Sequence, residues 1–199
     1  MQVVKPQKVT TGLEKSIPAK ESSYQIKISL DGIKPPIWRR VLVEGDISLD
    51  DFHNIILDAM GWEGYHLYNF RINNSLYSVV DEDDFGLMDY IDSEEVKLSD
   101  VVYKEKQKFK YTYDFGDNWK HTILIEKILP FDDDQDYPVC IKGKRNCPPE
   151  DCGGIWGYQN LLEAIGDKNH PEHEELLEWA GGDFDPEEFS LDGINACLY

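Results

Sequence analysis

The chain has 199 residues, of which 41% are hydrophobic and 30% charged, so it can bury a substantial core and is predicted to be globular. Acidic residues outnumber basic ones by 39 to 20, which gives a formal net charge of −19. Such a negative field repels phosphate backbones and therefore argues against direct nucleic-acid binding. A solvated acidic surface explains this charge, and a docking face for a basic protein partner is the alternative.

Neither membrane insertion nor export is indicated by the sequence. The longest apolar runs fall far short of the roughly 20 residues that a membrane-spanning helix needs. Residues 1–23 contain lysines and prolines and lack the apolar stretch of a signal peptide. We therefore expect a cytoplasmic protein that stays out of membranes and keeps its four cysteines reduced.

The chain is predicted to consist of an extended arm, residues 1–23, followed by a single α+β domain, residues 24–199. Residues 24–31 alternate apolar and polar side chains, as a half-buried strand does. Residues 37–44 resume this pattern after two prolines, which cannot donate ladder hydrogen bonds. These two segments are predicted to pair as a β-hairpin.

A helix is predicted over residues 49–60. Ser48 and Asp51 have the spacing of a capping box, which satisfies backbone amides at the start of a helix. Apolar residues then recur at helical spacing until Gly61, a residue that commonly follows the last turn.

A second hairpin is predicted from residues 67–72 and 76–80, because the intervening residues 73–75 (Asn-Asn-Ser) tolerate positive φ. The order up to this point is ββαββ. Residues 81–100 hold nine acidic side chains and one lysine, and are predicted to form a solvated loop with a short turn of helix from Ser99.

A third hairpin is predicted from residues 109–115 and 119–125, which both alternate apolar and polar side chains. The apolar faces match if Phe115 lies opposite Trp119, which leaves a three-residue loop whose last residue is left-handed. This long hairpin is expected to pack on the same sheet as the ββαββ unit.

The remaining chain is predicted to be mainly helical. Residues 130–155 are rich in Asp, Pro, Gly and Cys and are predicted to be a loop. Three short helices are predicted over residues 158–165, 171–180 and 186–198, the last two starting at prolines, which suit the first helical position.

Three cysteines could form a zinc site with one histidine. Cys140, Cys147 and Cys152, together with His121, provide the three thiolates and one imidazole of a tetrahedral structural site. The spacing lacks the C-x-x-C pair usual for such sites. The alternative is that the thiols are reduced and packed as small hydrophobic side chains.

A second set of polar residues surrounds the predicted third turn. Asp114, Asp117 and His121 could serve in acid/base chemistry or bind a divalent ion. The predicted register places His121 on the packed face and Asp114 on the opposite one, and an Asp in a turn often bonds backbone amides. The alternatives are a structural role in the turn for Asp117 and a hydrogen-bonded place in the core for His121.

A basic and aromatic patch is formed by Trp38, Arg39 and Arg40, with Lys27 and Lys34 nearby. Arginine binds phosphates and carboxylates bidentately, so this patch could hold an anion. The alternative is that one arginine faces solvent and the other pairs with local acidic residues.

Common catalytic fingerprints are absent from the sequence. It contains no Walker A motif, no G-x-S-x-G motif and no G-x-G-x-x-G motif. Residues 114–116 spell the Asp-Phe-Gly of protein kinases, but none of the other kinase motifs accompanies them.

Four segments occur together in a characteristic order: Ile33–Arg40; Ala59–Trp62 followed by His66 and Leu67; Tyr113–Trp119 followed by His121; and Cys147–Gly154 followed by Gly157 and Tyr158. As a set, they resemble the plasmid pRiA4b ORF-3-like family over residues 23–198. The resemblance implies an α+β fold with a ubiquitin-like grasp, and an association with mobile elements as passenger proteins. It implies no catalytic residues. The candidate functional surface taken from these segments comprises Trp38, Arg39, Arg40, His66, Asp114, Asp117 and Trp119.

Three functions remain open on the sequence. The leading hypothesis is a non-enzymatic binding or accessory module, with a basic protein as its partner. The alternative is a metal-dependent, hydrolase-like enzyme with a Cys/His or Asp/His site and zinc as the cofactor. A nucleic-acid-associated factor of mobile elements is the third.

Overall fold

The computed structural model describes residues 21–80 and 89–198. It is a mixed α+β fold with one eight-stranded sheet. The strands are β1 (Ser22–Leu30), β2 (Trp38–Glu44), β3 (Tyr68–Ile72), β4 (Ser75–Ser78), β5 (Tyr90–Asp92), β6 (Lys108–Tyr113), β7 (Trp119–Pro130) and β8 (Val139–Lys144). The helices are α1 (Leu49–Met60), α2 (Leu98–Val101), α3 (Gly154–Gly166), α4 (His173–Trp179) and α5 (Leu191–Cys197). None of the helices in these two ranges is long and apolar enough to cross a membrane.

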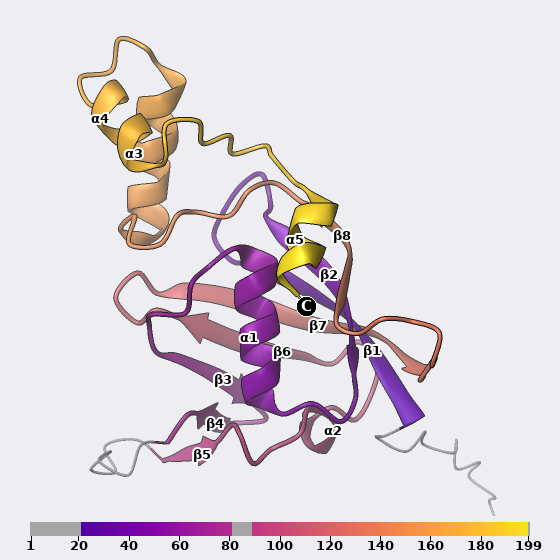
Figure 1. Cartoon of the computed structure of the whole chain (residues 1–199). Helices are drawn as coiled ribbons and strands as arrows, with labels where there is room; N and C mark the ends of the chain where they lie inside the picture. The colour runs from indigo at the N-terminus through magenta and orange to yellow at the C-terminus, as the bar shows by residue number, and fades with distance from the viewer. Residues whose placement is uncertain (1–20, 81–88, 199) are drawn as a thin grey trace, which may run out of the picture.

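The sheet has the strand order β5-β4-β3-β6-β7-β1-β2-β8. All neighbouring strands run antiparallel except β4 and β5, which are parallel. The predicted ββαββ unit is confirmed, and the long β6–β7 hairpin lies in the middle of the same sheet, between β3 and β1 (Figure 1). The strands of the N-terminal unit are therefore separated by a hairpin that comes later in the sequence.

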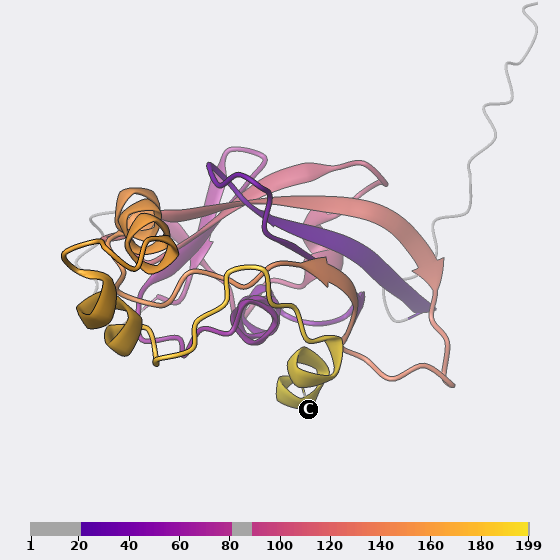
Figure 2. The same ribbon diagram turned by 90° about the horizontal axis from the view of Figure 1, so that it is seen from above.

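Helix α1 lies across one face of this sheet, as the helix does in a ubiquitin-like grasp (Figures 1 and 2). Its start is the predicted capping box: the Ser48 hydroxyl accepts from the Asp51 amide, and the Asp51 carboxylate accepts from the Ser48 amide. It ends at Gly61, whose φ is +82°. The apolar stripe of α1 includes Phe52 and Ile56, which are fully buried against the sheet. The prediction for residues 49–60 is therefore confirmed at both ends.

The first two predicted hairpins are also present. β1 and β2 pair antiparallel from Ser23 opposite Glu44 onward. β3 and β4 are joined by Asn73 and Asn74, which both have positive φ, while Ser75 already pairs with Ile72. The turn is thus one residue shorter than predicted, as a two-residue turn with both residues left-handed requires.

The predicted register of the third hairpin is wrong by two residues. Tyr113, not Phe115, lies opposite Trp119. The strand ends early because Asp114 takes a left-handed conformation (φ +53°), and its carboxylate accepts the Gly116 amide at 2.8 Å. The turn closes when the Asn118 amide donates to the Asp114 carbonyl at 2.6 Å, with Asn118 left-handed as predicted. A shift of two residues keeps the side chains that still pair on their predicted faces, because the period of a strand is two. The faces predicted for Asp114 and Phe115 are wrong, because both residues lie beyond the end of β6: Asp114 is buried, and Phe115 is 45% exposed.

The segment predicted as a loop over residues 130–155 contains a strand. β8 pairs antiparallel with β2 at the edge of the sheet, and β7 continues to Pro130. Alternation is weak in β8, because its residues other than Cys140, including Ile141, are partly or fully exposed on an edge strand. Of the predicted acidic loop, residues 81–88 lie outside the described chain, and the rest contains β5 and α2.

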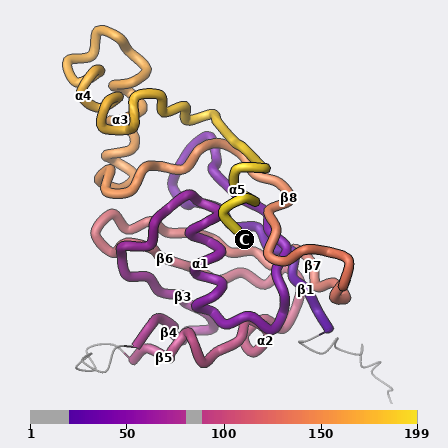
Figure 3. Tube along the Cα trace, viewed as in Figure 1, coloured from indigo at the N-terminus to yellow at the C-terminus, as the bar shows by residue number. Residues whose placement is uncertain are grey.

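The three C-terminal helices exist with shifted bounds. α3 begins at Gly154, four residues before the predicted start, and α5 begins at Leu191 rather than near Pro186. α3 and α4 gather at one end of the molecule, and the chain then returns to place α5 beside α1 and β8 (Figure 3). The end of the sheet that carries the β6–β7 turn therefore lies beneath the first turn of α3.

Candidate functional site

Pairing of β3 with β6 brings His66 and Asp114 together, although they are far apart in the sequence. Tyr68 lies opposite Tyr113 in this register, and the Asp114 amide donates to the Leu67 carbonyl at 2.9 Å. His66 is thus two residues before the start of the pairing on one strand, and Asp114 is one residue after it on the other. Their side chains meet at the end of the sheet.

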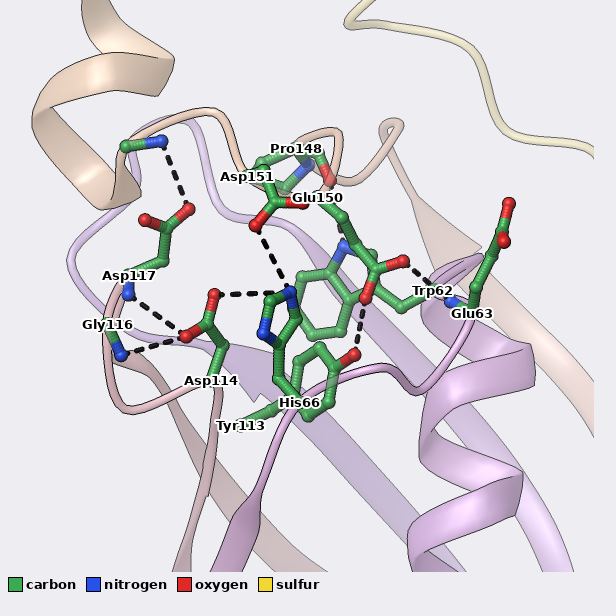
Figure 4. Close-up of polar contacts among 11 residues, drawn as sticks. Trp62, Glu63, His66, Tyr113, Asp114, Gly116, Asp117, Pro148, Glu150 and Asp151 are labelled. Atoms are coloured by element: carbon green, nitrogen blue, oxygen red, sulfur yellow. Dashed lines mark hydrogen bonds and ion pairs between the residues drawn. The ribbon is translucent and has the colours of Figure 1, made fainter.

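A loop between β8 and α3 crosses this end of the sheet and is held there by hydrogen bonds to three residues. The Trp62 indole donates to the Pro148 carbonyl at 2.9 Å. The Glu150 carboxylate accepts the Glu63 amide at 2.9 Å and the Tyr113 hydroxyl. The loop therefore presents the residue after Glu150 at a fixed place above His66 (Figure 4).

The loop is fixed further at its junction with α3. The Gly153 amide donates to the Asp117 carboxylate at 3.0 Å. Gly154 lies directly on the β6–β7 turn: a Cβ at this position would be 2.6 Å from the Asp117 carbonyl oxygen. The turn that carries Asp114 and the loop before α3 thus form one packed unit.

His66, Asp114 and Asp151 form a cluster of one imidazole and two carboxylates (Figure 4). His66 Nε2 lies 3.2 Å from Asp151 Oδ1 and 3.8 Å from Asp114 Oδ2. One ligand atom from each residue lies within 4.8 Å of the other two. Across residues 21–80 and 89–198, this is the one group of three or more His, Cys, Asp or Glu side chains with such spacing.

The imidazole nitrogen at the centre of the cluster has no aligned hydrogen bond. His66 Nε2 is inaccessible to solvent and, although two carboxylates are near, makes no hydrogen bond of acceptable geometry. Buried polar atoms are nearly always hydrogen-bonded, and an unpaired one beside two carboxylates is a place where a water or an ion can bind. Nε2 therefore faces two carboxylates without an aligned hydrogen-bond partner.

Both carboxylates of the cluster come from residues with an unusual backbone. Asp114 and Asp151 have φ of +53° and +57°. Aspartate enters the left-handed region more readily than most residues, and such conformations gather at functional sites. Asp114 is also buried, with 7% of its surface exposed, whereas the Asp151 side chain is 71% exposed. One carboxylate is therefore fixed beneath the cluster, and the other forms its open side.

Tyr113 forms the floor of the site. Its ring packs edge-on against the His66 ring, with centroids 5.8 Å apart, and face-on against Trp62. Burial, together with the hydrogen bond to Glu150, raises the pKa of the Tyr113 phenol well above its usual range. The phenol therefore stays protonated at physiological pH and acts as a donor that holds Glu150.

The predicted cysteine and histidine ligands are not gathered around one point. Cys147 Sγ accepts from Arg39 Nη2 at 3.2 Å, while the Cys140 and Cys152 thiols lie near the carbonyls of Lys142 and Gly154. Burial raises the pKa of Cys147 to about 11 and of Cys152 to about 12, so both thiols are protonated near neutrality.

His121, the predicted fourth ligand of that set, lies in the core. It is fully buried on β7, and its Nδ1–H donates to the Trp119 carbonyl at 3.1 Å. Its other nitrogen, Nε2, is buried without a hydrogen bond, and its ring meets Trp62 edge-on. Burial lowers the pKa of His121 to about 4, which keeps the ring neutral.

The other proposed surface residues divide into buried and exposed ones. Trp119 is 1% exposed and belongs to the core, and Asp117 holds the loop before α3. Arg39 is buried and donates to the carbonyls of Ala59, Trp38 and Lys144. It thereby joins the end of α1 to β2 and β8, without a carboxylate partner in the described chain.

Arg40 is the more exposed of the two arginines. It pairs with Glu126 through two hydrogen bonds and lies over the Trp38 ring, as does Lys27. The basic and aromatic patch predicted from the sequence is thus divided by strand alternation: Trp38 and Arg40 lie on one face of β2, and Arg39 lies on the other.

This division predicts that replacing arginine with lysine will affect stability differently at residues 39 and 40. We expect Arg39→Lys to lower the free energy of unfolding by about 2 kcal/mol or more, because one ammonium cannot replace the fork of donors that satisfies three carbonyls. Arg40→Lys, at a partly exposed ion pair, is expected to cost less than about 1 kcal/mol. Urea unfolding of both variants tests this, and equal losses would contradict it.

Sequence reasoning missed Asp151 as a member of the cluster. It stands between Glu150 and Cys152, in a segment whose cysteines suggest a zinc site, and shortly before Gly153 and Gly154. An Asp close to two glycines is a signal for a turn with left-handed residues. No local pattern, however, indicates that this turn lies beside His66.

Comparison with known proteins identifies relatives that cover nearly the whole chain. The family model of plasmid pRiA4b ORF-3-like proteins matches residues 22–193. An uncharacterized protein of Sinorhizobium fredii (strain NBRC 101917 / NGR234), y4hQ, is 39% identical over 179 residues, which are 89% of this chain and 91% of y4hQ.

A solved structure agrees with the fold described above. The crystal structure of MM3350, a protein of unknown function from Methanosarcina mazei Go1, superposes with a TM-score of 0.79 at 39% identity, covering 86% of this chain and 97% of MM3350. The family model spans His66, Asp114 and Asp151, the three residues of the cluster. The chain belongs to the plasmid pRiA4b ORF-3-like protein family.

Proposed function

We propose that the protein binds a divalent transition-metal ion through His66 Nε2 and one carboxylate oxygen each from Asp114 and Asp151. The observation that carries this proposal is the buried His66 Nε2, which has no hydrogen bond and lies 3.2 and 3.8 Å from the two carboxylates. Ligand atoms around a tetrahedral zinc ion lie about 3.4 Å apart, given bonds of roughly 2.0 to 2.1 Å. The spacing of the cluster suits such an ion with small side-chain adjustments.

The donor set indicates which metals suit the site. One imidazole and two carboxylates are ligands for Zn²⁺, Mn²⁺ or Fe²⁺, whereas thiolates are lacking. A divalent cation would also offset the repulsion between two carboxylates that share one imidazole. The neighbouring carboxylates of Asp117 and Glu150 hold the surrounding backbone and so support the ligands from outside.

Three protein ligands leave at least one coordination position for an external group. This is the arrangement of catalytic zinc sites, in which the metal lowers the pKa of a bound water. The exposed Asp151 side chain leaves the cluster accessible from solvent. Metal-assisted hydrolysis is therefore the class of reaction that the site supports best. An Asp/His site is favoured over the cysteine set, but His66 and Asp151 take the places that the sequence analysis gave to His121 and Asp117.

Calorimetric titration of chelator-treated protein with Zn²⁺ and with Mn²⁺ tests the proposal. We expect one saturable site, and we expect Asp114→Asn to weaken binding at least about tenfold, or roughly 1.4 kcal/mol. Asparagine retains an oxygen for the Gly116 amide, so the turn should persist. His66→Gln should have an effect at least as large.

Two control variants show whether the metal binds at this cluster. Asp117→Asn removes a nearby charge but keeps an acceptor for the Gly153 amide, so its affinity for the metal should change less than about twofold. A Cys147→Ser, Cys152→Ser variant should retain the metal by elemental analysis. Loss of binding in either control equal to that in Asp114→Asn, or no saturable binding to the unaltered protein, would overturn the proposal.

A further inference from the structure

A cavity of about 270 Å³ lies between α3 and α4, beside the metal cluster, with which it shares Asp151. Its lining also includes Asn160, Leu161, Glu175, Leu176 and Trp179. The two helices are held together around it, since His173 Nδ1–H donates to the Ala164 carbonyl at 2.8 Å. The cavity is therefore formed by a packed helix pair.

The charged side chains that line the cavity are acidic. They are those of Asp151 and Glu175, and none that lines this cavity in the described chain is basic. Trp179 contributes an indole ring and is 49% exposed, although large apolar side chains usually lie inside. Trp156, which is 82% exposed, lies one turn before Asn160 on the same face of α3. Carboxylates and indole rings together are the groups that recognise organic cations.

We propose that this cavity binds a lysine or arginine side chain presented by a basic polypeptide. The ammonium or guanidinium group would pair with Asp151 and Glu175, and the alkyl stem would pack on Leu176 and the Trp179 ring. An anion would meet two like charges here, and a purely apolar ligand would desolvate both carboxylates without compensation. The net charge of −19 favours a polypeptide with several basic residues over a single amine, because the whole surface field attracts it.

The cavity shares Asp151 with the proposed metal ligands, but binding of the cation needs no metal. The test is made on chelator-treated protein so that the two proposals can fail separately. The probe is a fluorescein-labelled peptide of three Gly-Ser-Arg repeats, with capped ends, measured by fluorescence anisotropy. The matched peptide carries citrulline in place of arginine, which keeps the shape and removes the charge. We expect saturable binding of the arginine peptide and at least about tenfold weaker binding of the citrulline peptide.

Variants of α4 locate the site. Trp179→Ala and Glu175→Gln are each expected to weaken binding about five- to tenfold, whereas Glu178→Gln, which removes an exposed charge from the same helix outside the cavity lining, should change it less than about twofold. Circular dichroism should show unchanged folding in all three. Equal losses for Glu175→Gln and Glu178→Gln would show attraction by the surface field alone and would overturn the site.

Competition identifies the source of the cation. Free agmatine carries the same guanidinium on a short alkyl chain and should displace the peptide only at concentrations at least about tenfold higher. Agmatine that binds as tightly as the peptide would overturn the polypeptide as the ligand. No binding of either probe would overturn the proposal as a whole.

Discussion

Gly157→Ala is expected to destabilise the protein by about 3 kcal/mol or more, which is at the upper end of what overpacking costs. A Cβ at residue 157 would lie 1.7 Å from the Cys152 carbonyl oxygen and 2.7 Å from its carbonyl carbon. Both are backbone atoms, so no side chain can rotate away. The helix or the loop before it must move, and the Gly157 amide, which donates to the Gly153 carbonyl at 3.1 Å, moves with it.

This displacement should reach the metal cluster, because the loop that would move carries Asp151. We therefore expect Gly157→Ala to weaken Zn²⁺ binding at least about tenfold, although Gly157 has no ligand atom. Urea unfolding and calorimetric titration measure the two effects. If the metal ion were bound elsewhere, stability would fall and the affinity would stay unchanged.

Gly166→Ala is the matched control, on the same helix. Apart from its chain neighbours and the backbone of its own helix, no atom lies within 4 Å of a Cβ at Gly166, the last residue of α3. Alanine there should be neutral or should stabilise the protein by up to about 1 kcal/mol, because it restricts the unfolded chain more than glycine does. A Gly157→Ala variant as stable as the Gly166→Ala variant would show that the loop and α3 pack less closely than described.

The elements that sequence reasoning predicts well are those with local signals. The bounds of helix α1 follow from Ser48, Asp51 and Gly61, which mark its ends within a single segment. The hairpin around Asn73 and Asn74 is predictable because left-handed asparagines are a feature of two-residue turns. Such patterns are fixed by interactions between residues a few positions apart, and tertiary packing does not override them.

The errors concern features that depend on distant parts of the chain. β8 is missed because an edge strand has few buried residues, so its pairing with β2 leaves little alternation in the sequence. The predicted β6–β7 register is wrong because a left-handed Asp114 shortens β6. Hydrophobic matching of two strands fixes the face of each residue but leaves shifts of two residues undetermined.

In the candidate site, too, local sequence signals identify residues, whereas their arrangement depends on distant parts of the chain. His66 and Asp114 are recognisable as candidate residues, but their proximity follows from the pairing of β3 with β6, which no local pattern encodes. Asp151 joins them only because the loop before α3 is bonded to Trp62, Glu63 and Tyr113. Sequence reasoning thus identifies two of the three side chains and none of the geometry.

Two buried histidines should make the protein sensitive to acid well above the pH at which carboxylates are protonated. Burial lowers the pKa of His53 and of His121 to about 4. His53 stacks on Tyr68, with ring centroids 3.6 Å apart, and its Nδ1 is hydrogen-bonded to the Tyr111 hydroxyl at 2.7 Å. Neither ring can take up a proton in the folded state without placing a charge in the aromatic core beneath α1.

The direction of the pH dependence follows from the proton balance. Between pH 6.5, the ordinary pKa of histidine, and about 4, the unfolded chain binds a proton at each of these positions and the folded chain does not. The free energy of unfolding contributed by neutral His53 and His121 is therefore fully present above pH 6.5 and is lost as the pH falls toward 4. At about 1.4 kcal/mol per pH unit, the loss approaches roughly 3 kcal/mol per histidine.

Urea unfolding at several pH values between about 7.5 and 4.5 tests this, with His121→Phe and Ile123→Val compared with the unaltered protein. Phenylalanine keeps a ring of similar size, loses the bond to the Trp119 carbonyl and cannot be protonated. It should destabilise the protein at about pH 7.5, but its deficit should shrink by roughly 2 to 3 kcal/mol at about pH 4.5. Ile123→Val, at a fully buried residue of the same strand, should cost about 1 kcal/mol at every pH. The plot of unfolding free energy against pH for Ile123→Val should run parallel to that of the unaltered protein. If the His121→Phe plot also ran parallel, His121 would be taking up its proton in the folded state. The core around His121 would then be more polar than its contacts with Trp62 and Tyr111 indicate.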